Sequence, residues 1–160
     1  MQSPLKTILT SGFLAGTLDL TTALVVYSVM LQKVTATRLL QSIASGVFGK
    51  TAYDGGSEMV IFGIVLHFMI AFSFAIFYFF IYPHIPFLKK QKIISGLLYG
   101  LFAWIIMNLI ILPLVFSHLS VMTPNSIVIG ATILMIMIGL PISIVTSKYY
   151  NAKSEPGLES

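Results

Sequence analysis

The sequence predicts an all-α integral membrane protein, folded as a bundle of four transmembrane helices. Of its 160 residues, 57% are hydrophobic and only 9% are charged, whereas soluble domains carry roughly 25% charged residues. Four apolar segments also reach the roughly 20 residues that a helix needs to cross a bilayer. These segments are residues 8–31, 57–82, 93–116 and 127–149.

Proline residues mark the boundaries between the segments. Pro83 and Pro86 follow the second segment, and Pro124 precedes the fourth. Because proline disfavours helix at the residue before it, these positions suit helix ends. The first segment is too long for the hydrophobic region of a signal peptide, so we expect it to be an uncleaved span. Residues 1–150 are therefore predicted to form one transmembrane domain, and the polar residues 151–160 a disordered tail.

The basic residues are distributed unequally between the two sides of such a four-span topology. One side carries six of them, namely Lys6, Lys89, Lys90, Lys92, Lys148 and Lys153. The other side carries three, Lys33, Arg38 and Lys50. Because cytoplasmic loops are enriched in lysine and arginine, this distribution predicts that both termini are cytoplasmic.

The first loop, residues 32–56, is longer than a simple connection requires. Its centre has helical periodicity, with Leu39, Leu40, Ile43 and Val47 on one face and Arg38, Gln41, Ser42 and Ser45 on the other. This pattern predicts a short amphipathic helix on the non-cytoplasmic surface. A lid packed on the end of the bundle, a gate and a lipid contact are all compatible with it.

A short internal repeat relates the first and third segments. The residues at 11–16 read SGFLAG, and those at 95–100 read SGLLYG. Two pseudo-repeated helical hairpins would produce this pattern. Both copies contain glycines four residues apart, which allow helices to approach closely in a membrane. The predicted packing positions are Gly12, Gly16, Gly96 and Gly100.

Two ionisable residues lie deep in the predicted spans. Asp19 is about 16 Å along the first segment, and His67 is about 15 Å along the second from the opposite surface, at 1.5 Å per residue. A charge at this depth costs roughly 2.5–3.5 kcal/mol unless it is paired or faces a polar cavity. We therefore expect Asp19 and His67 to point inward, within reach of each other. Asn108 of the third segment is a candidate third member.

Several function classes are excluded by what the sequence lacks. The chain has no cysteine, which removes disulfides, thiolate nucleophiles and cysteine-bound metals. It carries no glycine-rich phosphate loop and no HExxH or GxSxG motif. His84 and His118 fall in loops on opposite sides of the membrane and cannot share a metal. We expect no enzyme activity, no cofactor or metal site and no nucleic-acid surface. The aromatic residues around 77–82 and 149–150 are typical of interfacial belts.

The residues from Ser11 to Asp19, the loop helix and the Gly96–Gly100 pair together resemble small bacterial inner-membrane proteins of the YagU-like type. The similarity covers most of residues 8–150. It implies a location in the bacterial inner membrane and a link to acid tolerance. It implies no catalytic residues.

These observations leave three hypotheses for function. The leading one is a membrane protein whose midplane polar site, Asp19, His67 and Asn108, binds or conducts a proton or a small solute, as a monomer or a homo-oligomer. In the second, the polar pair is a structural clamp in an accessory or scaffold subunit of a larger membrane complex. The third is a lipid-binding protein that uses the helix around residues 38–47. All three place the chain in a lipid bilayer.

Overall fold

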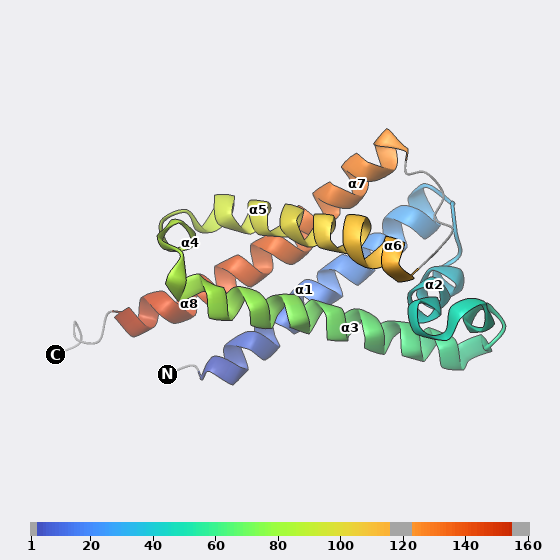
Figure 1. Cartoon of the computed structure of the whole chain (residues 1–160), viewed down its shortest axis with the longest axis horizontal. Coiled ribbons are helices and arrows are strands. Elements are labelled where there is room, and N and C mark those ends of the chain that lie inside the picture. Colours follow the sequence, from blue (N-terminus) through green and yellow to red (C-terminus); the bar gives the residue numbers. More distant parts are fainter. Residues whose placement is uncertain (1–2, 116–122, 155–160) are drawn as a thin grey trace.

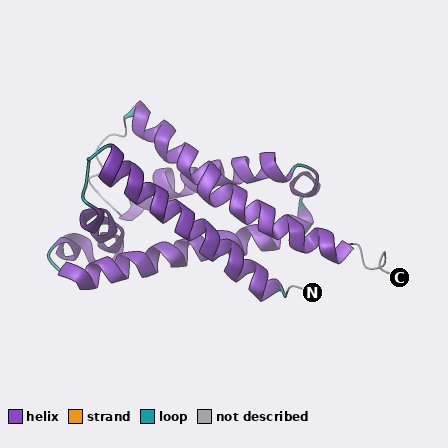
Figure 2. Cartoon of the chain, turned by 180° about the vertical axis from the view of Figure 1, so that it is seen from behind, coloured by secondary structure: helices purple, strands orange, loops and turns teal. Residues whose placement is uncertain are grey.

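The computed structural model describes residues 3–115 and 123–154, which form helices joined by short connections (Figures 1 and 2). The first half contains α1 (Pro4–Leu24), the π-helical η1 (Val25–Met30), α2 (Ala36–Phe48), the 3₁₀ turn η2 (Gly49–Tyr53), α3 (Gly56–Ile81) and the 3₁₀ turn η3 (Tyr82–His84). The second half contains α4 (Pro86–Lys90), α5 (Lys92–Ile105), the π-helical η4 (Ile106–Ile111), α6 (Leu112–Val115), α7 (Pro124–Leu134), the π-helical η5 (Met135–Gly139) and α8 (Leu140–Ser154).

These elements combine into four long helices that are apolar enough to cross a membrane, so the prediction of four spans is confirmed at that level. We name them spans one to four, and they cover Pro4–Met30, Gly56–His84, Lys92–Leu114 and Pro124–Lys153. Within the described residues, only span two lacks a π-helical segment.

Capping residues explain where three of the helices begin. The Ser3 hydroxyl accepts a hydrogen bond from the backbone N–H of Lys6, and Pro4 occupies the first turn of α1. Thr35 and Thr123 cap α2 and α7 in the same way. Such caps satisfy N–H groups that have no partner within the helix, and proline is favoured in the first turn.

The prediction of a disordered tail from residue 151 was wrong for its first four positions. Helix α8 continues through Ser154. Residues 151–154 contain no glycine or proline, and the first helix breaker is Pro156. The remainder of the predicted tail lies outside the described residues.

The two ends of the bundle differ in what they carry. The start of α1, the end of α8 and the whole of α4 lie at one end, whereas α2 and η2 lie at the other (Figure 1). We call these the terminal end and the α2 end. The terminal end therefore gathers the lysines of α1, α4, α5 and α8, and the α2 end carries Lys33, Arg38 and Lys50.

Gly12 and Gly16 form the contact between span one and span two. A Cβ atom at Gly16 would lie 2.9 Å from Cδ1 of Phe68 and 3.1 Å from Cβ of Ala71. A Cβ atom at Gly12 would overlap the ring of Phe72. The first glycine pair therefore packs against side chains of α3, and we call this contact the first seam.

Gly96 and Gly100 form the equivalent contact between span three and span four. A Cβ atom at Gly100 would collide with the backbone of Leu134 and Met135. A Cβ atom at Gly139 of span four would likewise collide with the backbone of Gly96 and Gly100. We call this contact the second seam. Each glycine pair thus packs against the span that follows it in the chain, and not against the other glycine pair.

Helix α2 is present, but burial does not follow its two predicted faces. Leu40 of the apolar face is 7% exposed, but Val47 of the same face is 65% exposed, and Gln41 and Ser45 of the polar face are each 4% exposed. The reason is a close approach at Gly63 of α3, where a Cβ atom would collide with the Leu40 backbone. Because the two backbones touch there, the small and polar side chains of α2 face α3.

The aromatic belt predicted at the terminal end is partly a core. Phe77 and Phe80 face outward, but Tyr78 and Tyr82 are 0% and 1% exposed. The Tyr82 ring stacks on that of Tyr150, with their centroids 5.0 Å apart. The Tyr78 hydroxyl has hydrogen-bond partners inside the protein, which favours burial of its ring. The Tyr82 hydroxyl is buried without a partner among the described residues, and its ring is held by stacking alone.

Candidate functional site

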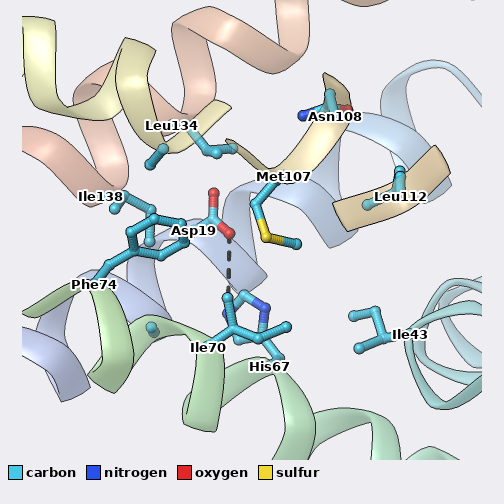
Figure 3. Close-up of a pocket in the computed structure, with 12 residues that line it drawn as sticks. Asp19, Ile43, His67, Ile70, Phe74, Met107, Asn108, Leu112, Leu134 and Ile138 are labelled. Atoms are coloured by element: carbon cyan, nitrogen blue, oxygen red, sulfur yellow. Dashed lines mark ion pairs between the residues drawn. The ribbon is translucent and has the colours of Figure 1, made fainter. Parts of the chain in front are cut away.

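A cavity of about 220 Å³ lies among the four spans and α2 (Figure 3). Its polar side chains are Asp19, His67 and Asn108. Apolar side chains complete the wall, contributed by Ile43, Ile70, Ala71, Phe74, Ala103, Met107, Leu112, Leu134 and Ile138. The cavity is therefore a mainly apolar chamber with a few polar groups, which is the usual composition of a small-ligand site.

The structure brings Asp19 and His67 together across the first seam. Oδ2 of Asp19 lies 3.9 Å from Nε2 of His67, and each side chain is 14% exposed. The Nε2–H group donates its hydrogen bond to the backbone oxygen of Gly16, at 2.9 Å. The carboxylate is therefore within range of an ion pair, but it does not accept the hydrogen bond from His67.

Asp19 is left with an unsatisfied oxygen. Its Oδ1 atom is buried and has no hydrogen-bond partner among the described residues. In Figure 3 the carboxyl group projects between Phe74, Leu134 and Met107. A buried carboxylate oxygen without a donor is costly, because its lost hydration is not replaced. From outside the protein, a water molecule would donate a hydrogen bond to it, a small cation would bind to it, and a proton would neutralise the carboxylate.

Asn108 lines the same cavity but does not join the pair. Its side-chain nitrogen donates to the backbone oxygen of Trp104, four residues earlier, at 3.0 Å. Asn108 and its neighbour Met107 lie in the π-helical segment η4. Ile138, on the cavity wall, belongs to the π-helical segment η5. Two of the four spans thus present irregular helical turns to the cavity, a feature that is frequent at functional sites.

Sequence reasoning missed one contributor to this site. Ile43 brings α2 into the cavity wall, which could not be foreseen because it depends on the backbone contact at Gly63.

A second polar cluster lies beside the second seam. The Tyr78 hydroxyl donates to Oγ of Ser143 at 2.8 Å and lies 3.1 Å from Oγ of Ser95. Ser143 in turn donates to the backbone oxygen of Lys92 at 2.6 Å. Three buried hydroxyls from α3, α5 and α8 thereby satisfy one another, and we call them the hydroxyl cluster.

The structure offers no evident metal site within residues 3–115 and 123–154. No group of three or more histidine, aspartate or glutamate side chains comes together there. Nδ1 of His84 lies 3.0 Å from the backbone oxygen of Phe80, on the preceding turn. His118 lies outside the described residues.

Four helices long and apolar enough to cross a membrane place the chain in the class of multi-pass helical membrane proteins. No family model matches the chain, and neither a curated protein nor a solved structure matches it at a significant level.

Proposed function

We propose that this protein binds and transfers a proton at the Asp19–His67 cavity, without a catalytic role. The observation that carries the proposal is the buried Oδ1 atom of Asp19, which has no partner within the described chain. An ionisable group inside a membrane span is rare, and where it faces a cavity it commonly belongs to an ion or proton pathway. A proton is the smallest ligand that removes the charge of this buried carboxylate.

His67 supplies the second proton-exchanging group. Its Nε2–H group is held by Gly16, which fixes the ring beside the carboxylate. The other ring nitrogen, Nδ1, is the atom that we propose takes up the proton. Imidazole is the side chain best suited to exchange protons at physiological pH. Asp19 and His67 can therefore pass a proton across the first seam.

The proposal also specifies the membrane in which the protein lies and its orientation there. The lysines at the terminal end favour a cytoplasmic location for both termini. The resemblance to YagU-like proteins supports the bacterial inner membrane. In this orientation α2 lies at the non-cytoplasmic face, where its exposed Val47 contacts the lipid interface and its Ile43 lies at the cavity.

We also propose that the two halves of the bundle are pseudo-repeats. The supporting observation is that Gly12 and Gly16 pack against span two just as Gly96 and Gly100 pack against span four. The four spans would then descend from two copies of one helical hairpin, related by an axis along the membrane normal.

Proton flux into proteoliposomes tests the proposed function. Wild-type protein is compared with Asp19→Asn, which keeps the shape of the side chain and removes its charge. Glu58→Gln is the matched control, because Glu58 is an exposed carboxylate in the first turn of span two. We expect a pH gradient to collapse faster with wild type and with Glu58→Gln than with Asp19→Asn. Equal flux from all three proteins at every pH would overturn the proposal.

One observation favours a second candidate function. The 2.9 Å hydrogen bond from His67 to Gly16 joins spans one and two, as a structural clamp in an accessory or scaffold subunit would. Under that alternative, native mass spectrometry of protein extracted in mild detergent would show a fixed set of other membrane subunits. A monomer or a homo-oligomer alone favours the proton site.

A further inference from the structure

A second hollow, a groove, opens between spans two and three at the terminal end. It has a volume of about 320 Å³. Its walls are Phe77, Tyr78 and Ile81 of α3, Leu98, Tyr99 and Phe102 of α5, and residues of the α4 turn, including Phe87 and Leu88. Almost all of this lining is apolar, and several of its side chains are exposed on the outside of the bundle.

Spans two and three meet at this groove through aromatic rings. The Phe77 ring stacks against Tyr99 and Phe102, with ring centroids 6.4 Å and 5.9 Å apart. Spans one and two, by contrast, approach closely in the first seam, because Gly12 and Gly16 of span one leave room for side chains of span two. Spans two and three are therefore held apart by bulky side chains, and the space between them has the apolar character that a lipid chain requires.

The end of the groove is strongly basic. Lys89 and Lys90 directly follow the groove residues Phe87 and Leu88, and Lys92 begins α5. All three lysines are exposed. The acidic residues of the described chain are Asp19, inside the bundle, and Asp54 and Glu58, beside α2 at the other end. The positive charge of the three lysines therefore has no acidic side chain of the described chain nearby.

We propose that this groove binds one acyl chain of an anionic phospholipid, whose phosphate is held by Lys89, Lys90 and Lys92. The apolar wall and the basic cluster are adjacent along α4, as the tail and the head group of one lipid molecule are. An anionic surface attracts each nearby lysine by about 1 kcal/mol, which is about fivefold in affinity. This inference does not depend on the proton site, which lies on the first seam.

Native mass spectrometry of the full-length protein tests the proposal. The protein is titrated in detergent with dioleoyl phosphatidylglycerol or with dioleoyl phosphatidylcholine, which share their acyl chains and differ in head-group charge. We expect wild type to retain one phosphatidylglycerol in preference to phosphatidylcholine. Lys89→Gln with Lys90→Gln should weaken phosphatidylglycerol retention about fivefold per lysine. The matched double variant Lys33→Gln with Lys50→Gln, at the α2 end, should retain it as wild type does.

A second pair of variants tests the acyl-chain part of the site. Leu98→Trp fills the groove and should lower the retention of both lipids, whereas Leu9→Trp, at an equally exposed position on span one, should not. Equal retention of both lipids by wild type would overturn the proposal, as would an equal loss in the two lysine pairs. A lipid-free dimer would also overturn it, because a second copy would then occupy the groove.

Discussion

The two glycine seams of this bundle perform the same task with different partners. In the first seam, Gly12 and Gly16 face the ring edges of Phe72 and Phe68. In the second seam, Gly100 faces the backbone of span four. A ring can rotate away from a new neighbour, whereas a helix backbone can move only as a whole. The first seam is therefore adjustable, and the second is rigid.

The polar groups beside the two seams also differ, in whether their hydrogen bonds are satisfied. Beside the rigid second seam, the hydroxyls of Tyr78, Ser95 and Ser143 bond to one another. Beside the adjustable first seam, Asp19 keeps a buried oxygen with no partner among the described residues. A mutually satisfied network stabilises a fold, whereas an unsatisfied charged group destabilises it. This difference distinguishes the hydroxyl cluster, which stabilises the fold, from the proposed proton site.

Gly100→Ala should have the largest effect on stability. The added methyl group would collide with the backbone of Leu134 and Met135, and overpacking of this kind costs about 1–3 kcal/mol. Gly12→Ala should cost less, because the Phe72 ring can move. Denaturant titration in mixed micelles measures both free energies of unfolding. A larger loss for Gly12→Ala would show that the first seam is the rigid one.

Ser143→Ala should lower stability by about 1 kcal/mol, the range measured for hydrogen bonds in membranes. The variant removes a partner of Tyr78 and Ser95 and leaves their hydroxyls buried. Because the hydroxyl cluster does not line the Asp19–His67 cavity, proton flux in proteoliposomes should be unchanged. A loss of flux at full stability would assign the hydroxyl cluster to the proton pathway.

Thr146→Val should have the smallest effect on stability, and it should raise stability where the preceding variants lower it. The Thr146 hydroxyl is buried and has no hydrogen-bond partner in the described structure. Replacing it with a methyl group removes an unsatisfied polar atom and should raise the free energy of unfolding by about 0.5–1 kcal/mol. Ser143→Val is the control, because there the hydroxyl is bonded and the sign should reverse. A stability loss for Thr146→Val would show that its hydroxyl has a partner.

The long-range features that could be predicted were those with a strong local signal. The four spans follow from runs of apolar residues, and the expectation that Asp19 meets His67 follows from their similar depth and the cost of a buried charge. Length, hydropathy and depth are properties of single helices, so they could be read without knowing how the helices are arranged.

The features that could not be predicted depend on contacts between elements. The buried face of α2 is set by its backbone contact at Gly63 and not by its own periodicity. Tyr78 and Tyr82 are typical of a membrane interface, but their rings are buried against Tyr99 and Tyr150. Asn108 lines the cavity as predicted, but its side chain bonds to the backbone of its own helix and not to the pair.

The free energy of unfolding of Asp19→Asn tests the central claim most directly, because the substitution changes charge without changing shape. If Asp19 is a functional group held in an unsatisfied state, removing its charge should leave stability unchanged or raise it. If Asp19 is half of a structural clamp, the variant should lose about 0.6–2 kcal/mol, as Ser143→Ala does. The proposed function predicts the first result, and a loss equal to that of Ser143→Ala would contradict it.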